Sequence, residues 1–558
     1  MRVLGVNALF HDPSAALVVD GRVVAAAEEE RFSRRKHGKR PLPFAAWELP
    51  EKAMAWCLEE GGLRPQDLDA VAYSFDPALA KPAEEMGLPD PWDWLRVQYA
   101  ERAPQFLATA LPGLSPSTVR FVPHEVAHAA SAALASPFPV ASALSLDGRG
   151  ERSSHLAGRY DHGRLEVLAS QELPHSLGLV YESLTEHLGF LRSSDEYKVM
   201  ALASYGEPRF LDDLREVLYA TGDGGFVAEV PDWERWAPRR TDDGTWGTAH
   251  GGRAEHADLA ASVQARLEEV LVDLATWLHG QTGDRVLTMA GGTALNCVAN
   301  SRVWRESPFE EVWVQPAAGD SGTALGAALQ LAAEAGDTVE PMGSAALGRA
   351  WGDEALARWL RTAQVPFTTP DDLPAEVGRI LADNGVVAWF DGRAELGPRA
   401  LGHRSLLAHP GPVENLERLN DVKGREQFRP VAPMVLLEDA AEIFSGGPVP
   451  SPYMLFVHEV APAWRDRIAA VVHVDGTARI QTVDDSTPRL QATIRAFKEL
   501  TGLPVVVNTS LNTAGRPMVD DPRDALELFG SAPVDALVLG PHLVRRPDVF
   551  AAPSGATA

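Results

Sequence analysis

A three-strand pattern that occurs twice constrains the fold of this chain more than any other feature of its sequence. The expected strands are residues 2–7, 14–19 and 22–28 in the first copy and residues 141–146, 154–160 and 164–171 in the second. Each copy reads as an antiparallel meander, with Asp20-Gly21 as a tight hairpin turn in the first. The repeat predicts an internal duplication of one sheet-forming unit. Unrelated hairpins in an ordinary α/β protein are the alternative.

Each copy also has a polar turn after its first strand. The first turn contains His11 and Asp12, and the second is Asp147-Gly148-Arg149-Gly150. This arrangement resembles the actin/Hsp70/sugar-kinase superfamily, in which the two turns clasp the phosphates of a nucleotide. The resemblance implies a duplicated α/β domain that binds a nucleotide.

Charge and cysteine content narrow the classes of partner. The formal net charge of −26 disfavours a nucleic-acid surface or an anionic membrane as the main partner. No apolar stretch of the sequence approaches the roughly 18 residues that span a bilayer. The two cysteines, Cys57 and Cys297, provide neither a disulfide framework nor a zinc knuckle, as is typical of a reducing compartment. We therefore expect a cytoplasmic protein with no nucleic-acid or membrane partner, and a homodimer remains open.

Two histidines four residues apart, His124 and His128, lie in the segment VPHEVAHAAS. On a helix this spacing puts both imidazoles on one face, where they can hold one metal ion. The letters also match the HExxH motif of zinc proteases, with Glu125 as the general base. The following residues, AASAALASPF, lack the glycine and histidine of a metzincin, and no helix with a downstream glutamate follows. The sequence therefore disfavours a protease.

A mixed histidine and aspartate site is the better interpretation of this pair. Asp147 in the second turn and Asp320 in the GDSG segment can complete it. Two imidazoles with two carboxylates suit divalent iron, zinc or manganese. The alternative is that the two histidines only cap the start of a helix.

Two glycine-rich segments, AGGTALN and GDSG, each follow an expected strand. Glycine lets the backbone approach a ligand closely, and the helix that follows presents its first N–H groups. Their position after the repeated meander predicts contacts to adenosine or phosphate from Gly291, Gly292, Asn296 and Gly319. An apolar stripe over residues 258–278 predicts a core helix before the first segment.

An acidic stretch with glycine and proline, around residues 332–343, is the expected linker between two domains. The expected domains are residues 1–343 and 350–558. Strands of the second domain are expected at residues 386–390, 431–437, 470–473 and 505–508.

The second domain is rich in cationic side chains within segments that also contain glycine and proline. These side chains are Arg393, Arg399, Arg404, Lys423, Arg425, Arg429 and Arg479. Guanidinium groups bind phosphates and carboxylates through paired hydrogen bonds, so the clustering predicts a site for such anions. The segment NTSLN, residues 508–512, adds amide and hydroxyl groups at the end of an expected strand. The alternative is a solvated surface in which the arginines pair with Glu395, Glu417 and Glu426.

Over essentially its whole length the chain resembles the NodU/CmcH/TobZ-type O-carbamoyltransferases. The matching blocks are FHDPSAALVVDG, AEEERFSRRKHG, HEVAHAASA, LDGRGE, SLGLVYESLTEHLGF, AGGTALN, GDSGTALGAA, GRAELGPRALGHRS, VKGREQFRPVAP, HVDGTARIQTV and NTSLN. So many blocks in one order make the resemblance specific. It implies an N-terminal domain like the tRNA threonylcarbamoyladenosine transferase, of actin/Hsp70 type, and a C-terminal YrdC-like α/β domain.

The resemblance also implies a two-stage transfer reaction. In the YrdC-like domain, carbamoyl phosphate yields carbamate, which attacks ATP, bound with Mg²⁺, to form carbamoyl adenylate. In the first domain an acceptor hydroxyl takes the carbamoyl group and AMP leaves. The implied metal is Fe(II) or a similar divalent ion at the positions of His124, His128, Asp147 and Asp320. The implied acceptor is a small hydroxylated natural product, such as an aminoglycoside or a glycosylated polyketide in antibiotic biosynthesis.

Individual roles follow from the matched positions. The residues expected to bind carbamoyl phosphate and ATP are Arg399, Arg404, Lys423, Arg429, Arg479, Asn508, Ser510 and Asn512. In the first domain His11 is the expected general base and Asp12 the residue that orients it; a simple hydrogen bond within the turn is the alternative. Lys36 is expected to contact the adenylate, with a plain surface run as the alternative.

Lys198 is assigned to the nucleotide site of the first domain. Its block, EYKVMALA, departs from the family's GKxMGLA-like pattern because Tyr197 and Ala201 stand at small or glycine positions. A role for this block in shaping the acceptor pocket is the alternative. The aromatic segments 89–94 and 231–246, outside the matched blocks, are also expected to border the acceptor site, with Trp-anchored surface loops as the alternative.

Two other functions use related domains. A hydrogenase-maturation carbamoyltransferase brings CxxC zinc fingers and an acylphosphatase domain, which the presence of only two cysteines nearly excludes. A non-catalytic nucleotide-binding scaffold of the actin/Hsp70 kind would bind ATP in the first domain and would not need the arginine cluster.

Overall fold

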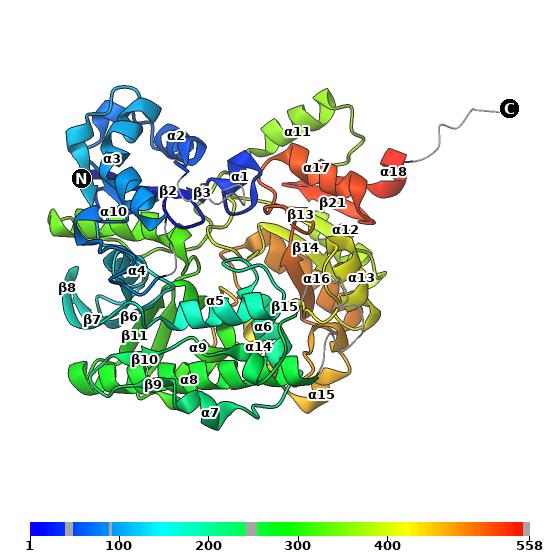
Figure 1. The fold of residues 1–558 in the computed structure, drawn as a ribbon. Helices are drawn as coiled ribbons and strands as arrows, with labels where there is room; N and C mark the ends of the chain where they lie inside the picture. Colours follow the sequence, from blue (N-terminus) through cyan, green and yellow to red (C-terminus); the bar gives the residue numbers. More distant parts are fainter. Residues whose placement is uncertain (39–47, 89–91, 241–253, 551–558) are drawn as a thin grey trace, which may run out of the picture. The chain divides into compact units, whose positions relative to one another are not determined.

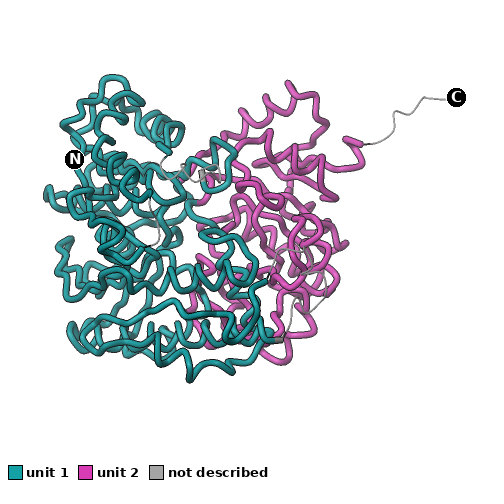
Figure 2. Tube along the Cα trace, viewed as in Figure 1, with its two compact units in different colours: residues 1–347, 396–398 teal, residues 348–395, 399–558 magenta. Residues whose placement is uncertain are grey.

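Two compact units make up the chain in the computed structural model, which describes residues 1–38, 48–88, 92–240 and 254–550 (Figure 1). Unit 1 is Met1–Leu347 together with Leu396–Pro398, and unit 2 is Gly348–Glu395 together with Arg399–Ala558 (Figure 2). The sequence-based division at residues 343–350 did not include the return of Leu396–Pro398 to unit 1.

Unit 1 contains two five-stranded sheets with the same order of strands. In the first sheet the order β3-β2-β1-β4-β5 corresponds to Arg22–Glu28, Ser14–Val19, Arg2–Asn7, Ala70–Tyr73 and Val119–Phe121. In the second the order β8-β7-β6-β11-β12 corresponds to Arg164–Glu172, Ser153–Asp161, Val140–Leu146, Val286–Ala290 and Glu311–Val314. In both sheets an antiparallel meander is extended by two parallel strands beside its first strand. The predicted duplication and the actin/Hsp70/sugar-kinase-like fold are confirmed.

Helices surround these sheets. Within the described residues the helices of unit 1 are α1 (Glu30–Ser33), α2 (Glu51–Glu60), α3 (Asp93–Ala110), α4 (His124–Ala133), α5 (Leu177–His187), α6 (Glu196–Ala203), α7 (Leu211–Arg215), α8 (Ala254–Thr282), α9 (Cys297–Glu306) and α10 (Thr323–Glu334). A two-stranded ribbon of β9 (Leu218–Ala220) and β10 (Phe226–Ala228) completes the unit. Helix α8 contains the predicted core helix.

Both faces of the first sheet are buried, because successive strand residues point to opposite sides and each side meets a helix. Val3 of β1 lies in an apolar core with Leu325 of α10. Leu4, its neighbour in sequence, lies in a second core with Trp56 of α2. A strand buried on both faces does not alternate apolar with polar residues, which explains the apolar run at residues 3–6.

Helices α4 and α10 cross with almost no space between their backbones. Helix α10 packs on β1 and β2, α4 packs on β6 and β11, and the two helices pack on each other. A Cβ atom at Gly326 of α10 would lie 1.8 Å from the carbonyl oxygen of Ala127 in α4. A Cβ atom at Gly5 of β1 would likewise lie 1.8 Å from the carbonyl oxygen of Ala324. These two glycines permit an approach that brings the starts of α4 and α10 together.

Unit 2 is built on a seven-stranded mixed sheet covered by helices, so it is an α/β unit as predicted. In the order β19-β15-β20-β14-β13-β21-β22 its strands are Gln481–Val483, Ala432–Leu436, Val505–Ser510, Arg404–Ala408, Val387–Phe390, Ala536–Leu539 and His542–Arg545. A small sheet contains β16 (Phe444–Ser445), β17 (His458–Val460) and β18 (Thr477–Ala478). The helices are α11 (Asp353–Thr362), α12 (Leu373–Ala382), α13 (Glu414–Lys423), α14 (Leu437–Ile443), α15 (Pro462–Arg465), α16 (Pro488–Thr501), α17 (Pro522–Ser531) and α18 (Arg546–Phe550).

One predicted strand of unit 2 is wrong. Residues 470–473 were expected to be extended, but Ala469–Val471 forms a 3-10 turn instead. The backbone N–H of Ala470 donates to the carbonyl of Pro410, and that of Val471 donates to Ile468 three residues earlier. The segment is buried and apolar, and burial alone does not distinguish a strand from a packed turn. Within the described ranges, no helix combines the length and apolar character needed to cross a bilayer.

The crossing of α4 and α10 should be intolerant of a single methyl group. We expect Gly326→Ala to lower the free energy of unfolding by about 3 kcal/mol, because one of the two backbones must move. Gly280→Ala is the matched control, since Gly280 lies exposed in α8 with open space around its Cβ position. Alanine there should leave stability unchanged or raise it by up to about 1 kcal/mol. Thermal unfolding, monitored by circular dichroism, measures the stability of both variants. Equal melting temperatures for Gly326→Ala and Gly280→Ala would contradict the expectation.

Candidate functional site

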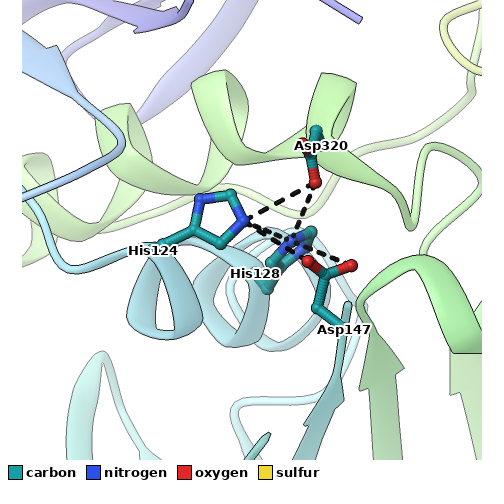
Figure 3. A group of neighbouring side chains, drawn as sticks. All are labelled: His124, His128, Asp147 and Asp320. Atoms are coloured by element: carbon teal, nitrogen blue, oxygen red, sulfur yellow. Dashed lines mark hydrogen bonds and ion pairs between the residues drawn. The ribbon is translucent and has the colours of Figure 1, made fainter. Parts of the chain in front are cut away.

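Four side chains predicted as metal ligands converge where α4, β6 and α10 meet (Figure 3). His124 opens α4 and His128 lies one turn later, so both rings point from one helical face. Asp147 follows β6, and Asp320 opens the 3-10 turn Asp320–Gly322 that leads into α10. The two Nε2 atoms are 3.2 Å apart. The distances from Nε2 to carboxylate oxygens are 3.6 Å for both His124 pairs and 3.5 and 3.8 Å for the His128 pairs.

These groups fit a divalent metal ion. Donor atoms of a tetrahedral site with metal–ligand distances near 2.0–2.1 Å lie about 3.3 Å apart, close to the spacing found here. All four residues are buried, and neither carboxylate oxygen of Asp320 has a hydrogen-bond partner among the described residues. A buried carboxylate without hydrogen-bond donors is costly, and a bound cation would offset that cost. Two nitrogens and two carboxylates do not select iron over zinc or manganese.

Neighbouring groups orient the potential ligands. Nδ1 of His124 lies 3.1 Å from the carbonyl oxygen of Ser74, so Nδ1–H donates there and Nε2 is directed at the group. A carboxylate oxygen of Asp147 accepts a 2.8 Å hydrogen bond from the backbone N–H of Gly292. Glu151 accepts hydrogen bonds from the backbone N–H groups of Asp76 and His124 at 2.7 and 2.9 Å, which fixes the start of α4.

Electrostatics favour ionised aspartates at this position. Burial alone would raise the pKa of Asp320, but His11, His124 and His128 hold it well below its usual range. Burial and the charge of Asp320 would raise the pKa of Asp147, and the two histidines hold it lower than usual. Glu125 behaves differently: burial and the charge of Asp147 raise its pKa to about 8. Its carboxyl accepts a 2.6 Å hydrogen bond from the hydroxyl of Ser145.

The first turn lies beside this group. Nε2 of His11 is 3.8 Å from a carboxylate oxygen of Asp320, and Nδ1 of His11 is 2.9 Å from Asp12. Lys36 extends toward Glu30, with Nζ 3.3 Å from both carboxylate oxygens. The structure therefore brings His11 and Asp12 to the four ligand-type residues, while Lys36 contacts Glu30.

Of the residues predicted to bind a nucleotide in unit 1, the three glycines lie beside Asp147 or Asp320, whereas Asn296 caps a helix. Gly291 has a φ of 88°, and a Cβ atom there would lie 2.1 Å from the carbonyl oxygen of Leu146, so only glycine fits. Gly319 precedes Asp320 directly, and Gly292 contacts Asp147 as described. Asn296 instead caps α9 through the N–H of Ala299 and pairs with Gln264.

Lys198 and the two aromatic segments were predicted to lie near the nucleotide or the acceptor, and the structure gives the contacts of their described residues. Nζ of Lys198 is 3.0 Å from Asp195 and lies over the ring of Phe190, so its charge is already paired. Residues 89–91 and 241–246 of the aromatic segments lie outside the described residues. Trp233 is buried and donates through Nε1 to the hydroxyl of Ser183 in α5, whereas Trp92 and Trp94 are exposed.

In unit 2 the cationic Lys423 meets the polar residues Ser510 and Asn512 at the end of β20. Nζ of Lys423 lies 2.5 and 3.0 Å from the carbonyl and hydroxyl oxygens of Ser510, and 2.6 and 3.1 Å from the side-chain and carbonyl oxygens of Asn512. Asn508 donates through Nδ2 to Gln481 and to the carbonyl of Ala400 at 3.0 and 2.7 Å. These bonds join β20 to the segments that carry Arg479 and Arg399.

Nε of Arg479 and Oδ1 of Asn508 are among the buried polar atoms of this region that lack a hydrogen-bond partner in the described residues. A buried donor and a buried acceptor without partners indicate a place where a polar ligand would be stabilised. Arg429, in contrast, pairs with Glu426 at 3.3 Å, as the alternative of a charged surface expects for that residue.

Arg404 does not fit the predicted phosphate role. Its side chain is fully buried, and its guanidinium lies 3.7 Å from the centre of the Phe390 ring. It donates to the backbone carbonyls of Asp391, Gly392, His403 and Arg349 at 3.0–3.2 Å. The guanidinium therefore ties loops together. The nearby Glu395 is also internal, because it accepts hydrogen bonds from three backbone N–H groups and not from surface arginines.

Sequence reasoning missed three residues around His11 and His124. Glu151 was visible only as the last letter of the block LDGRGE, with no sign that it caps α4. His37 contacts Asp12 through Nδ1 and Ser194 through Nε2. The only available signal was the presence of His37 in the block AEEERFSRRKHG, since Ser194 lies outside every matched block.

Comparison with known proteins gives matches over most of the chain. Residues 2–108 and 109–329 match the family model "Carbamoyltransferase N-terminus", and residues 378–546 match "Carbamoyltransferase C-terminus". Nodulation protein NolNO of Sinorhizobium fredii is 36% identical over 563 residues, which covers 97% of this chain and 80% of that protein. Nodulation protein U of Bradyrhizobium diazoefficiens is 34% identical over 564 residues, with 94% and 95% covered.

Solved structures are more distant. Full-length HypF in the phosphate- and nucleotide-bound form is 13% identical, with 61% of this chain and 56% of HypF covered. The TM-score of this match is 0.32.

The buried group of histidines and aspartates should bind a metal in solution. We expect Mn²⁺ or Zn²⁺ to raise the melting temperature of the metal-free protein. At a metal concentration one hundred times the dissociation constant, the free energy of unfolding should rise by about 2.7 kcal/mol. Asp320→Asn should abolish the increase, because it removes one ligand charge from a buried site. Asp161→Asn is the control, since Asp161 pairs with His162 at an exposed turn. Equal metal-induced shifts in both variants would exclude a metal at Asp320.

Proposed function

The chain belongs to the carbamoyltransferase family, and from this premise we propose that it is an ATP- and carbamoyl-phosphate-dependent O-carbamoyltransferase for a small hydroxylated natural product. The observation that carries the proposal is the placement of His11 beside two buried imidazoles and two buried carboxylates. A general base next to a possible metal site is what transfer from an adenylate to a hydroxyl requires.

The first stage is assigned to unit 2. Carbamoyl phosphate is hydrolysed to carbamate and phosphate, and a carbamate oxygen then attacks the α-phosphorus of ATP. Pyrophosphate leaves and carbamoyl adenylate remains. Charge on the phosphate oxygens shifts during this step, and fixed cationic donors stabilise it without reorganisation. Arg479 has an unsatisfied buried Nε for this purpose, and Lys423 holds Ser510 and Asn512 in place.

The second stage is assigned to unit 1. The acceptor hydroxyl attacks the carbamoyl carbon, its proton passes to Nε2 of His11, and the bond from that carbon to the phosphate oxygen breaks to release AMP. Asp12 accepts Nδ1–H of His11 and so leaves Nε2 unprotonated for this task. A divalent ion held by His124, His128, Asp147 and Asp320 would supply Lewis acidity at the phosphate. Fe(II) is the ion that the family resemblance implies.

A substitution in unit 2 should impair the first stage of the reaction, and a substitution in unit 1 should impair only the second. Arg479→Ala should lower pyrophosphate release by about 100-fold, because a donor to the developing charge is lost. His11→Gln should leave pyrophosphate release intact and lower carbamoyl transfer by about 10²- to 10⁴-fold. Arg495→Ala is the control in unit 2, since its exposed pair with Glu438 contributes little. A coupled pyrophosphate assay measures the first stage, and mass spectrometry of carbamoylated product measures the second.

The acceptor class is tested by incubating enzyme, ATP, carbamoyl phosphate and a divalent ion with aminoglycosides and glycosylated polyketides. We expect a mass gain of one carbamoyl group on a hydroxyl of at least one compound. Failure of the wild-type protein to release pyrophosphate with any divalent ion tested would falsify the proposed reaction. Pyrophosphate release without carbamoylation of any compound would refute the acceptor class alone.

A further inference from the structure

A line of hydrogen bonds leads away from His11 into unit 1. Nδ1 of His11 is 2.9 Å from one carboxylate oxygen of Asp12, and Nδ1 of His37 is 2.9 Å from the other. Nε2 of His37 is 2.8 Å from the hydroxyl of Ser194, which precedes α6. One carboxylate therefore bridges two imidazoles, and the outer imidazole is anchored to a third segment of the chain.

The backbone around this line is held in an uncommon conformation. Asp12 has a φ of 50° and His37 a φ of 57°, values in the left-handed region that residues other than glycine rarely adopt. The N–H of His37 donates to Glu30 at 2.8 Å, which fixes the backbone as well as the ring. Such local strain persists where surrounding contacts determine the conformation, and it is concentrated at functional sites.

A cation site is a poorer interpretation of the same residues. Asp12, Glu30 and His37 lie close enough to hold an ion. However, Lys36 already lies 3.3 Å from both carboxylate oxygens of Glu30, and the N–H groups of His37 reach both carboxylates. The charges that would attract an ion are thus already compensated within the protein.

We propose that His37 is a positioning residue for carbamoyl transfer, which fixes Asp12 so that Asp12 holds His11 with Nε2 directed at the acceptor. This inference rests on the proposed function, in which His11 takes the proton of the acceptor hydroxyl. Nδ1–H of His37 donates to Asp12, and Nε2 of His37 accepts the hydroxyl hydrogen of Ser194.

The geometry explains why a single aspartate would not suffice. Burial alone would raise the pKa of Asp12, but the two histidines hold it well below its usual range. The carboxylate thus stays ionised and accepts Nδ1–H of His11. Without His37 one of its oxygens would lose its donor, the carboxylate could rotate, and Nε2 of His11 would move from its place near Asp320. A displacement of about 1 Å at a reacting group costs up to about 100-fold in rate.

Two substitutions at His37 separate its two hydrogen bonds. His37→Asn keeps a donor near the position of Nδ1 and so preserves the bond to Asp12. His37→Gln keeps a polar group near the position of Nε2 and so preserves only the bond to Ser194. Because the acceptor is unidentified, water serves as the probe hydroxyl, and AMP release is measured with ATP, carbamoyl phosphate and Mn²⁺. Pyrophosphate release is measured in the same samples.

In a single turnover we expect His37→Gln to lower the rate of AMP release by about 10- to 100-fold and His37→Asn by about threefold or less, with the rate of pyrophosphate release unchanged in both. In a His11→Gln background, His37→Gln should cause no further loss, because the two residues act through one group. His162→Gln is the matched control: its Nδ1 also contacts an aspartate, but in the exposed turn between β7 and β8.

Equal losses for the two His37 variants, or the same loss with and without His11, would overturn the positioning role. Wild-type protein that releases no pyrophosphate would overturn the proposed function itself, and this inference with it. The positioning role is supported if His37→Gln lowers AMP release but not pyrophosphate release, if His37→Asn lowers AMP release by no more than about threefold, and if His37→Gln has no further effect in the His11→Gln background.

Discussion

Burying two like-charged carboxylates beside two imidazoles is the constraint on which unit 1 depends. Asp147 and Asp320 lie in a medium where an uncompensated charge is costly, so their positions must be fixed closely relative to His124 and His128. The duplicated sheets place Asp147 in a turn, and the crossing of α4 with α10 places the other three. The absence of side chains at Gly5 and Gly326 thus serves electrostatics as much as packing.

Local patterns in the sequence were sufficient for much of this architecture. The meander strands of both copies lie within a residue of their expected ends because hairpin signals and alternation act over short distances. The pairing of His124 with His128 is likewise a matter of four residues on one helix. The joining of Asp147 and Asp320 to that pair depends on segments up to 196 residues apart, counted from His124 to Asp320, and the repeat together with the glycine-rich turns provided the only guide to it.

Features that depend on long-range packing were not predictable in this way. Arg404 and Arg479 carry the same sequence-based prediction, but the structure differs from it at Arg404, whose fully buried guanidinium donates to four backbone carbonyls. The difference arises because loops distant in sequence pack against Arg404 of β14, and no local sequence pattern predicts which loops do so. The 3-10 turn at Ala469–Val471 and the return of Leu396–Pro398 to unit 1 are missed for the same reason.

The crossing of α4 and α10 has a mechanical consequence. Helix α4 belongs to the first copy of the repeat but covers the sheet of the second, and α10 belongs to the second copy but covers the sheet of the first. Each half of unit 1 is therefore clasped by a helix of the other, and separating the halves would strip both sheets at once. The spacing of His124 and Asp320 is therefore set by the same helix contact that joins the two halves of unit 1.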